Sequence, residues 1–209
     1  APMNDGIGGD LFVIVYEAST GQLTGLNASG WAPAKLTPAH LSAKGATRMP
    51  QRGIDSVTVP GTVDGWDMLL NRFGNMEFSQ VLAPAIDYAE AGFPVGEVVS
   101  IYWRDSVAAL RRDGPTAQTF LINGRAPEIG EIFRNPDLAW TYRQIAEHGR
   151  NAFYQGAVAQ KILATSQRHG GTMEMADLAE FSGEWVEPIS TEYHGWTVTE
   201  LPPNGQGIA

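Results

Sequence analysis

The chain has 209 residues, of which 43% are hydrophobic and 18% charged, the balance of an ordinary globular protein rather than a disordered or fibrous one. Its 14 basic and 23 acidic residues leave a net charge of −9, which argues against nucleic acid or anionic lipid as a partner. Because it contains no cysteine, disulfides, cysteine-ligated zinc and a cysteine nucleophile are excluded within these residues.

A glycine-rich segment at residues 6–9 leads into the first expected element, a β-hairpin over residues 10–27. Glycine has no Cβ, so three glycines in four residues allow another backbone or a ligand to come close. The apolar run 11–16 has no polar alternation, which predicts a strand buried on both faces. Residues 18–21 have the length and the glycine of a hairpin connection, so we expect antiparallel pairing.

A short helix over 38–44 and a β-branched strand over 57–59 precede a helical block at residues 61–181. The boundaries of its helices follow from apolar residues at helical spacing, from capping residues and from terminal glycines. We expect a loop over 113–134 with a small hairpin at Asn123-Gly124. The expected helices cover residues 62–73, 79–91 with Ser79 as the cap, 96–112, 136–148 with Asn135 as the cap, 157–167 and 174–180.

The last expected element is a second hairpin over residues 184–201, with two strands that turn at His194-Gly195. The order of hairpin, strand, helical block and hairpin predicts an α+β fold, and we expect residues 1–209 to form a single domain. No run of residues reaches the roughly 20 apolar positions of a membrane span.

The common catalytic and binding motifs are missing from the chain. No Gly-Lys-Ser/Thr follows a glycine cluster, and Gly-x-Ser-x-Gly does not occur. The four histidines never fall at metal-ligand spacing, so we expect no metal and no cofactor. Trp31 stands out as a large aromatic side chain in a polar, glycine-containing loop, where it could support a ligand.

A succession of motifs along the whole chain resembles the large subunit of γ-glutamyltranspeptidases. The segments that carry this resemblance, in the expected order, are Gly8–Tyr16, Ala32–Ala34, Val59–Gly65, Leu82–Ile86, Ala91–Val95, Asn135–Ala139, Ala152–Gly156, Gly170-Gly171, Asp177–Ala179 and Leu201–Ile208.

The resemblance implies the four-layer αββα sandwich of the N-terminal-nucleophile hydrolases, here truncated at both ends. In that family a precursor cuts itself and frees a threonine at the start of the small subunit, which attacks a γ-glutamyl amide such as glutathione. The implied partners are therefore this small subunit and a small-molecule amide, and no residue of this chain is expected to be catalytic. Family members are commonly periplasmic or extracellular.

The loop before Ala32-Pro33 departs from the family pattern. Family members that bind glutamate carry an arginine there, which holds the substrate α-carboxylate through two parallel bonds. Ser29 and Trp31 occupy the two positions where that arginine is found, so we predict substrate-binding residues without charge and an altered acyl specificity. Arg48 and Arg52 are possible replacements that no motif supports.

A second departure lies in the loop 202–207, Pro-Pro-Asn-Gly-Gln-Gly, where the family has Pro-Pro-Pro-Ser-Ser-Gly-Gly. Asn204 and Gln206 keep polar groups but change the shape of the loop. The alternative to an enzyme is a catalytically degenerate homologue that serves as a binding or scaffold protein. The segment that would distinguish the two, the threonine cleavage site, is not among these residues.

Overall fold

The computed structural model describes residues 2–207, which divide into two compact units. One unit consists of the residues up to Gly6 together with Met76–Gly149, and the other of Ile7–Asn75 together with the residues from Arg150 onward. Helices and strands are mixed, as the sequence predicts. That all 209 residues form one domain stays a prediction.

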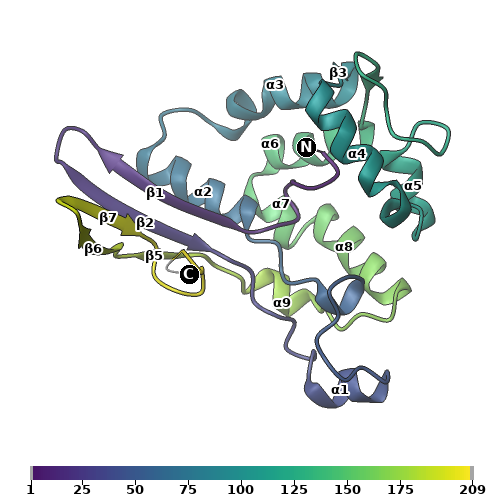
Figure 1. Cartoon of the computed structure of the whole chain (residues 1–209), viewed down its shortest axis with the longest axis horizontal. Helices are drawn as coiled ribbons and strands as arrows, with labels where there is room; N and C mark the ends of the chain where they lie inside the picture. The colour runs from purple at the N-terminus through teal and green to yellow at the C-terminus, as the bar shows by residue number, and fades with distance from the viewer. Residues whose placement is uncertain (1, 208–209) are drawn as a thin grey trace. The chain divides into compact units, whose positions relative to one another are not determined.

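The larger unit contains a three-stranded antiparallel sheet in the order β1-β2-β5 (Figure 1). Strand β1 (Leu11–Glu17) pairs with β2 (Gln22–Ala28), so Leu11 lies opposite Ala28, which confirms the predicted hairpin. Strand β5 (Glu184–Val186) pairs with the other edge of β2.

One face of β1 is uncovered, so the prediction of a strand buried on both faces is wrong within the described residues. Phe12, Ile14 and Tyr16 are 44%, 38% and 64% exposed. Their neighbours on the opposite face are only half-buried. An apolar run without alternation predicts two covered faces, but here helix α2 (Thr62–Phe73) packs on the sheet and no described layer covers the second face of β1.

The other elements of this unit agree with the sequence in part. Helices α1 (Pro38–Ala43), α8 (Ala157–Arg168) and α9 (Met175–Ala179) lie where they are predicted. The five-residue helix α7 (Arg150–Tyr154) is too short for a periodic signal and is not predicted. A 3₁₀ turn covers Ile54–Ser56.

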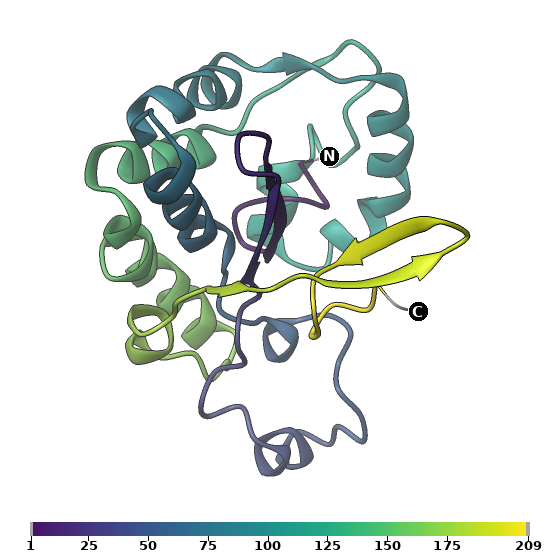
Figure 2. The same cartoon turned by 90° about the vertical axis from the view of Figure 1, so that its left-hand side faces the viewer.

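The predicted second hairpin is shorter than expected. Strands β6 (Ile189–Tyr193) and β7 (Trp196–Glu200) turn at His194-Gly195, both of which have positive φ (Figure 2). The first predicted strand is interrupted at Glu187-Pro188, since proline cannot donate to a ladder, and its beginning joins the central sheet as β5.

The predicted strand over 57–59 does not form. The Val59 amide donates one hydrogen bond to the Trp31 carbonyl (2.9 Å), and Pro60 has no N–H with which to continue a ladder. The two backbones nevertheless pass very close to each other. A Cβ on Gly30 would lie 1.5 Å from the Val59 carbonyl oxygen, and one on Gly61 would lie 1.9 Å from that of Ala28.

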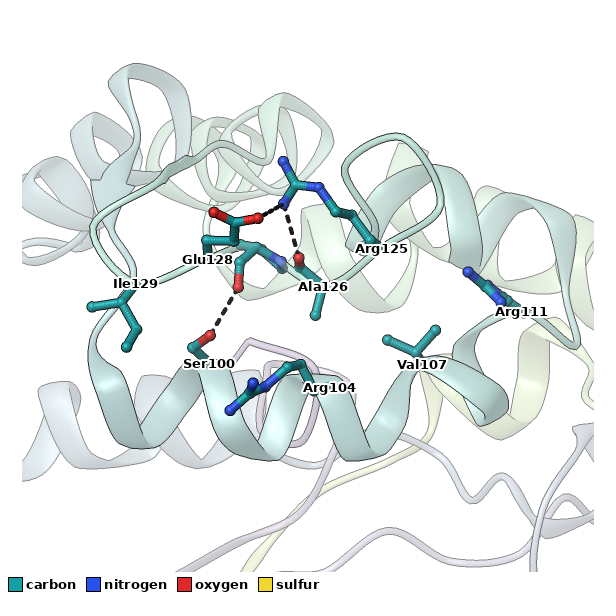
Figure 3. Close-up of a pocket in the computed structure, with 9 residues that line it drawn as sticks. Ser100, Arg104, Val107, Arg111, Arg125, Ala126, Glu128 and Ile129 are labelled. Carbon is teal, nitrogen blue, oxygen red and sulfur yellow. Dashed lines mark hydrogen bonds and ion pairs between the residues drawn. The ribbon is translucent and has the colours of Figure 1, made fainter.

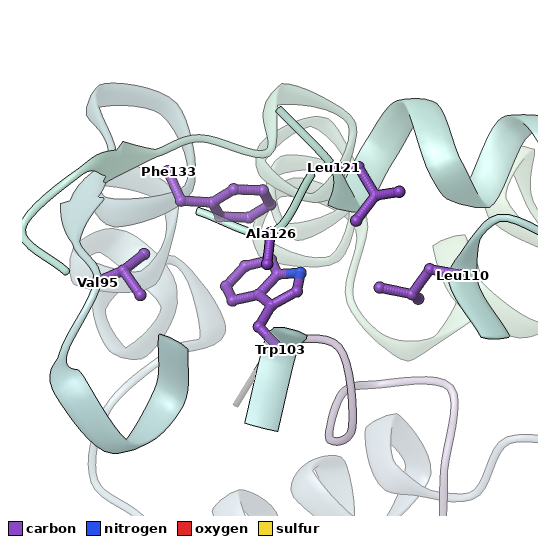
Figure 4. Close-up of a cluster of buried hydrophobic side chains, with 6 residues drawn as sticks. All are labelled: Val95, Trp103, Leu110, Leu121, Ala126 and Phe133. Atoms are coloured by element: carbon purple, nitrogen blue, oxygen red, sulfur yellow. The ribbon is translucent and has the colours of Figure 1, made fainter. Parts of the chain in front are cut away.

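The smaller unit is mainly helical. Helix α3 (Phe78–Ala91) packs against α6 (Pro136–His148), and the remaining elements are β3 (Phe93–Pro94), α4 (Glu97–Leu110), α5 (Gly114–Phe120) and β4 (Ile132–Phe133). Its core surrounds the fully buried Trp103, whose indole N–H donates to the Phe120 carbonyl (2.8 Å). The other members of the core are Val95, Leu110, Leu121, Ala126 and Phe133 (Figure 4).

The helix boundaries of this unit follow from local capping. Asn135 accepts a hydrogen bond from the Leu138 amide and begins α6, as predicted. Helix α3 is capped by Glu77, which forms a capping box with Gln80, so the assignment of Ser79 as the cap is wrong. Helix α5 forms where the sequence predicts a loop, so that prediction is wrong for Gly114–Phe120. The Asp113 side chain begins the helix by accepting from the Thr116 amide at 2.9 Å.

A buried ion pair joins three segments of the larger unit. Asp64 in α2 pairs with Arg150 in α7, and the second oxygen of Asp64 accepts from the Gly183 amide at 2.6 Å. Arg150 also donates to the Phe181 carbonyl. Nearby, the Tyr154 hydroxyl donates to the Pro60 carbonyl (2.6 Å) and accepts from the Asp64 amide (3.1 Å). Burial raises the pKa of this phenol well above its usual range, so it stays a neutral donor.

We expect Gly30→Ala to lower the free energy of unfolding by at least about 2 kcal/mol, because its Cβ cannot fit beside the Val59 carbonyl unless the backbone moves. Gly8→Ala is the matched control, since a Cβ there meets nothing within 4 Å. Urea denaturation measures both variants. Equal stability of the two would show that the close approach is not present in solution.

We expect Asp64→Leu to destabilise the protein by about 3–5 kcal/mol, because it leaves the Arg150 guanidinium buried without its partner. The double variant Asp64→Leu/Arg150→Met should recover a large part of this loss, since no charge then remains uncompensated. Thermal and urea denaturation of both variants test the coupling. Additive losses would contradict it.

Candidate functional site

The two predicted substrate-binding residues lie in the loop that follows β2. Ser29 belongs to a group of polar side chains, which we call the polar cluster and define as Asp10, Asn27, Ser29 and Asn204. Asp10 immediately precedes β1, Asn27 lies near the end of β2, and Asn204 lies in the loop after β7. The two departures from the family pattern, Ser29 and Asn204, are in direct contact through a hydrogen bond.

Hydrogen bonds connect every member of the polar cluster. The Ser29 hydroxyl donates to Asp10 Oδ2 (3.1 Å) and accepts from Asn204 Nδ2 (2.9 Å). Asn27 Nδ2 donates to Asn204 Oδ1 (3.0 Å), and Asn27 Oδ1 accepts from the Ser29 amide (2.9 Å). Each side chain thus fixes the rotamer of its neighbour.

Backbone contacts around the glycine-rich segment position Asp10. The Gly9 carbonyl accepts hydrogen bonds from the amides of Gly61 and Thr62, both at 3.0 Å, and from the Thr62 hydroxyl at 2.8 Å. Asp10 Oδ1 in turn accepts from the Gly30 amide at 2.9 Å. The start of α2 therefore contacts the backbone at Gly9, whereas a Cβ on Gly6 or Gly8 would meet nothing within 4 Å, so no close approach requires glycine at those two positions.

The polar cluster carries negative charge. Asp10 is its one ionisable member, and it lies on the surface with its carboxylate directed at Ser29 and Gly30. Within residues 2–207, neither Arg48 nor Arg52 forms a hydrogen bond or an ion pair with the cluster, so neither replaces the family's arginine in this structure. Among the described residues no lysine or arginine is hydrogen-bonded or ion-paired to the cluster, so a carboxylate ligand would meet the charge of Asp10.

Trp31 is held against the neighbouring elements and is still 44% exposed. Its indole N–H donates to the Asp177 carbonyl (3.0 Å), and its ring meets Phe181 edge-on with centroids 5.2 Å apart. The Asp177 carboxylate accepts from the Ala34 amide (2.9 Å) and from the Glu174 amide (2.7 Å). The loop therefore presents one side of a fixed indole to solvent.

A groove of about 310 Å³ lies where β1 meets the loop that carries Asn204. Its walls are mainly apolar side chains and glycines, with Glu200 as the charged member. They come from Phe12, Val13, Ile14, Thr199, Glu200, Leu201, Gly205 and Gly207. This surface suits an uncharged organic group better than an anion.

No group of three or more histidine, aspartate or glutamate side chains within residues 2–207 is arranged to hold a metal ion. None of the helices in that range is long and apolar enough to cross a membrane. The polar cluster, the exposed face of Trp31 and the apolar groove offer hydrogen bonds, an aromatic surface and a shaped surface to a ligand.

The sequence predicts Ser29 and Trp31 as substrate-binding residues, but it does not predict the residues that contact them. Asp10 is not among the predicted site residues, although its place directly after the glycine-rich segment and before a strand indicates a constrained carboxylate. Nothing in the sequence pairs Asn204 with Asn27, because the two residues are 177 positions apart. Asp177 is recognisable only as part of a capping box.

Comparisons with known proteins show which proteins the whole chain is similar to. The glutathione hydrolase-like YwrD proenzyme of Bacillus subtilis is 39% identical over 208 residues, which are 99% of this chain and 39% of that protein. The crystal structure of cephalosporin acylase from Bacillus halodurans matches with a TM-score of 0.92 and 42% identity, over 99% of this chain and 40% of that one.

The γ-glutamyltranspeptidase of Helicobacter pylori matches with a TM-score of 0.89 and 28% identity, over 97% of this chain and 59% of that one. The chain thus spans about two-fifths of the length of the curated relative described above. A family model described as gamma-glutamyltranspeptidase matches residues 1–209, and this chain therefore belongs to the γ-glutamyltranspeptidase family.

Proposed function

We propose that the complete protein is an amidohydrolase or acyltransferase of this family, with an acyl specificity that differs from γ-glutamyl. The observation that carries the proposal is the polar cluster, in which Ser29 stands in the place of an arginine and contacts Asp10. The similarity to a cephalosporin acylase supports an acyl group other than γ-glutamyl.

The proposed reaction uses a threonine nucleophile on a small subunit of the same precursor. The amine of that threonine accepts the proton of its own hydroxyl, and the oxygen attacks the substrate amide carbonyl. The amine product leaves, and the resulting ester passes its acyl group to water or to an acceptor amine. This chain supplies none of these reacting groups. Its role is to bind and orient the acyl group through Ser29 and Trp31.

The sheet supports the proposal of a partner subunit. Strand β1 lies at one edge of the described sheet, and it exposes Phe12, Ile14 and Tyr16 on one face. Exposed apolar strand surface of this kind is unfavourable in water and is typical of an interface. In the proposed αββα sandwich, the small subunit continues the sheet, and a second sheet packs on this exposed face.

The charge of Asp10 supports the proposed specificity. Two like charges about 4 Å apart repel by about 1 kcal/mol in water and about 4 kcal/mol at the effective dielectric of a protein surface. In addition, the loss of a bidentate contact with an arginine costs about 2–5 kcal/mol when the site is buried. Both effects disfavour an acyl group that carries an α-carboxylate and leave a neutral acyl group unaffected.

The test is an assay of the complete, processed protein with a γ-glutamyl anilide and with an anilide of an uncharged acyl group. We expect the uncharged substrate to have the higher kcat/KM. Turnover of the γ-glutamyl anilide at the rate of an ordinary transpeptidase would refute the altered specificity.

The alternative, a catalytically degenerate homologue that acts as a binding or scaffold protein, predicts a different polypeptide pattern. Electrophoresis of the full-length product should show two subunits if the precursor is competent and one if it is degenerate. A single uncleaved band together with no turnover of either anilide would favour the alternative.

We expect Asp10→Asn to shift selectivity toward the γ-glutamyl anilide. Asparagine is isosteric and can still accept from the Gly30 amide and bond to Ser29, while the negative charge is gone. The ratio of kcat/KM for the γ-glutamyl to that for the uncharged anilide should rise about 10-fold, which corresponds to about 1.4 kcal/mol. Glu17→Gln, at the other end of β1, removes the same charge and should leave the ratio unchanged.

A further inference from the structure

A second concave site lies in the smaller unit, between helix α4 and the segment Arg125–Ile129 (Figure 3). Its volume is about 670 Å³, within the usual range for small-molecule sites. Ser100, Arg104, Val107 and Arg111 line it from α4 and the residue that caps this helix. Their spacing of three or four residues places these four side chains along one stripe of the helix.

Three arginines surround this groove in a chain whose net charge is −9. Arg125 is neutralised, because its guanidinium pairs with both oxygens of Glu131 at 2.7 and 3.0 Å. Arg111 donates from Nε and Nη2 to the Gly124 carbonyl, which orients its guanidinium, and it forms no ion pair with any residue that the structure describes. Arg104 forms no hydrogen bond or ion pair within the described residues.

The acid at the groove is loosely held. Glu128 lies 3.9 Å from the Arg125 guanidinium, and its side chain is 79% exposed. Within residues 2–207 Glu128 forms no ion pair with Arg104 or Arg111. Two arginine charges remain on α4, seven residues and about 10 Å apart along the helix axis. Arg111 is already oriented by the Gly124 carbonyl, so Arg104 is the arginine whose planar fork is available to a ligand carboxylate, while Arg111 adds positive charge along the same stripe of the helix.

The wall opposite α4 is preorganised. The buried Ser100 hydroxyl donates to the Pro127 carbonyl at 3.0 Å and fixes the loop to the helix. The Glu128 amide donates to the Glu131 carboxylate at 2.8 Å, which closes the loop on itself. Ordering this wall therefore costs a ligand little entropy.

The remaining lining is apolar. Val107 and the buried Ala126 and Pro127 lie at the groove, and Ile129 is 63% exposed at its rim. An inorganic anion would leave these surfaces in water, whereas a hydrocarbon body would cover them.

We propose that this groove binds a small amphipathic carboxylate, with the carboxylate on Arg104, the Arg111 charge nearby on the same stripe of α4, and the apolar body against Val107, Pro127 and Ile129. The proposal does not depend on the acyl specificity or even the amidase activity of the complete protein, because its evidence comes from the smaller unit alone.

The test is calorimetric titration of the complete protein with 4-phenylbutyrate, and with 4-phenylbutyramide and inorganic phosphate as comparison probes. We expect saturable binding of the carboxylate with a Kd below about 1 mM. The neutral amide and phosphate should bind at least about 10-fold more weakly, because the amide has no negative charge for the arginine and phosphate has no apolar body.

Two variants locate the bound carboxylate. Arg104→Gln should weaken binding at least about 10-fold, since it removes the guanidinium that has no other partner. Arg112→Gln is the matched control, because it removes the same charge from an exposed residue just past the end of α4 that does not line the groove. Arg104 is exposed and makes no bond, so its variant should keep the wild-type melting temperature.

The outcomes are decisive in both directions. A loss confined to Arg104→Gln, at unchanged melting temperature, supports the proposal. Equal affinities of Arg104→Gln and Arg112→Gln, equal binding of the amide, equal binding of phosphate, or no saturable binding of 4-phenylbutyrate would overturn it.

Discussion

The larger unit depends on the buried ion pair between Asp64 and Arg150, whose side chains are 4% and 20% exposed. Neither charge is tolerable there alone, because the desolvation of an unpaired ion costs several kcal/mol. Each also satisfies a backbone group, Asp64 the amide of Gly183 and Arg150 the carbonyl of Phe181. The pair therefore fixes two helices and the chain segment that leads into β5, none of which is adjacent to the others in sequence.

This constraint reaches the candidate site through aromatic contacts. Phe181, whose carbonyl accepts from Arg150, stacks on Tyr154 at 5.8 Å and meets the edge of Trp31 at 5.2 Å. The Tyr154 hydroxyl donates to the Pro60 carbonyl. Pro60 directly follows Val59, against whose backbone Gly30 packs. The loop that carries Ser29 and Trp31 is thus held in place by contacts on both sides.

The sequence predicts those parts of the fold that local chemistry determines. The β1-β2 hairpin, the helix that ends at Gly74 and the helix that Asn135 caps all follow from periodicity and terminal residues. The failures have nonlocal causes: the apolar run 11–16 is covered on only one face here, and residues 57–59 find a single hydrogen bond instead of a ladder. At the site, the resemblance to family motifs predicts Ser29 as a substrate-binding residue. Its hydrogen-bond partners Asp10 and Asn204 come from distant segments of the chain, so local patterns do not predict them.

The contact between Ser29 and Asn204 links the two departures from the family pattern. An arginine at position 29 would bring a charge that Asp10 would neutralise, and Asn204 would lose the hydroxyl to which it donates at 2.9 Å. With serine there instead, the hydroxyl satisfies Asp10 and Asn204 together, while Asn27 and Asn204 satisfy each other. The Asn204 side chain in the loop after β7 thus complements the Ser29 hydroxyl after β2. Reversing one of the two changes without the other would remove this hydrogen bond and leave the remaining polar group without its partner.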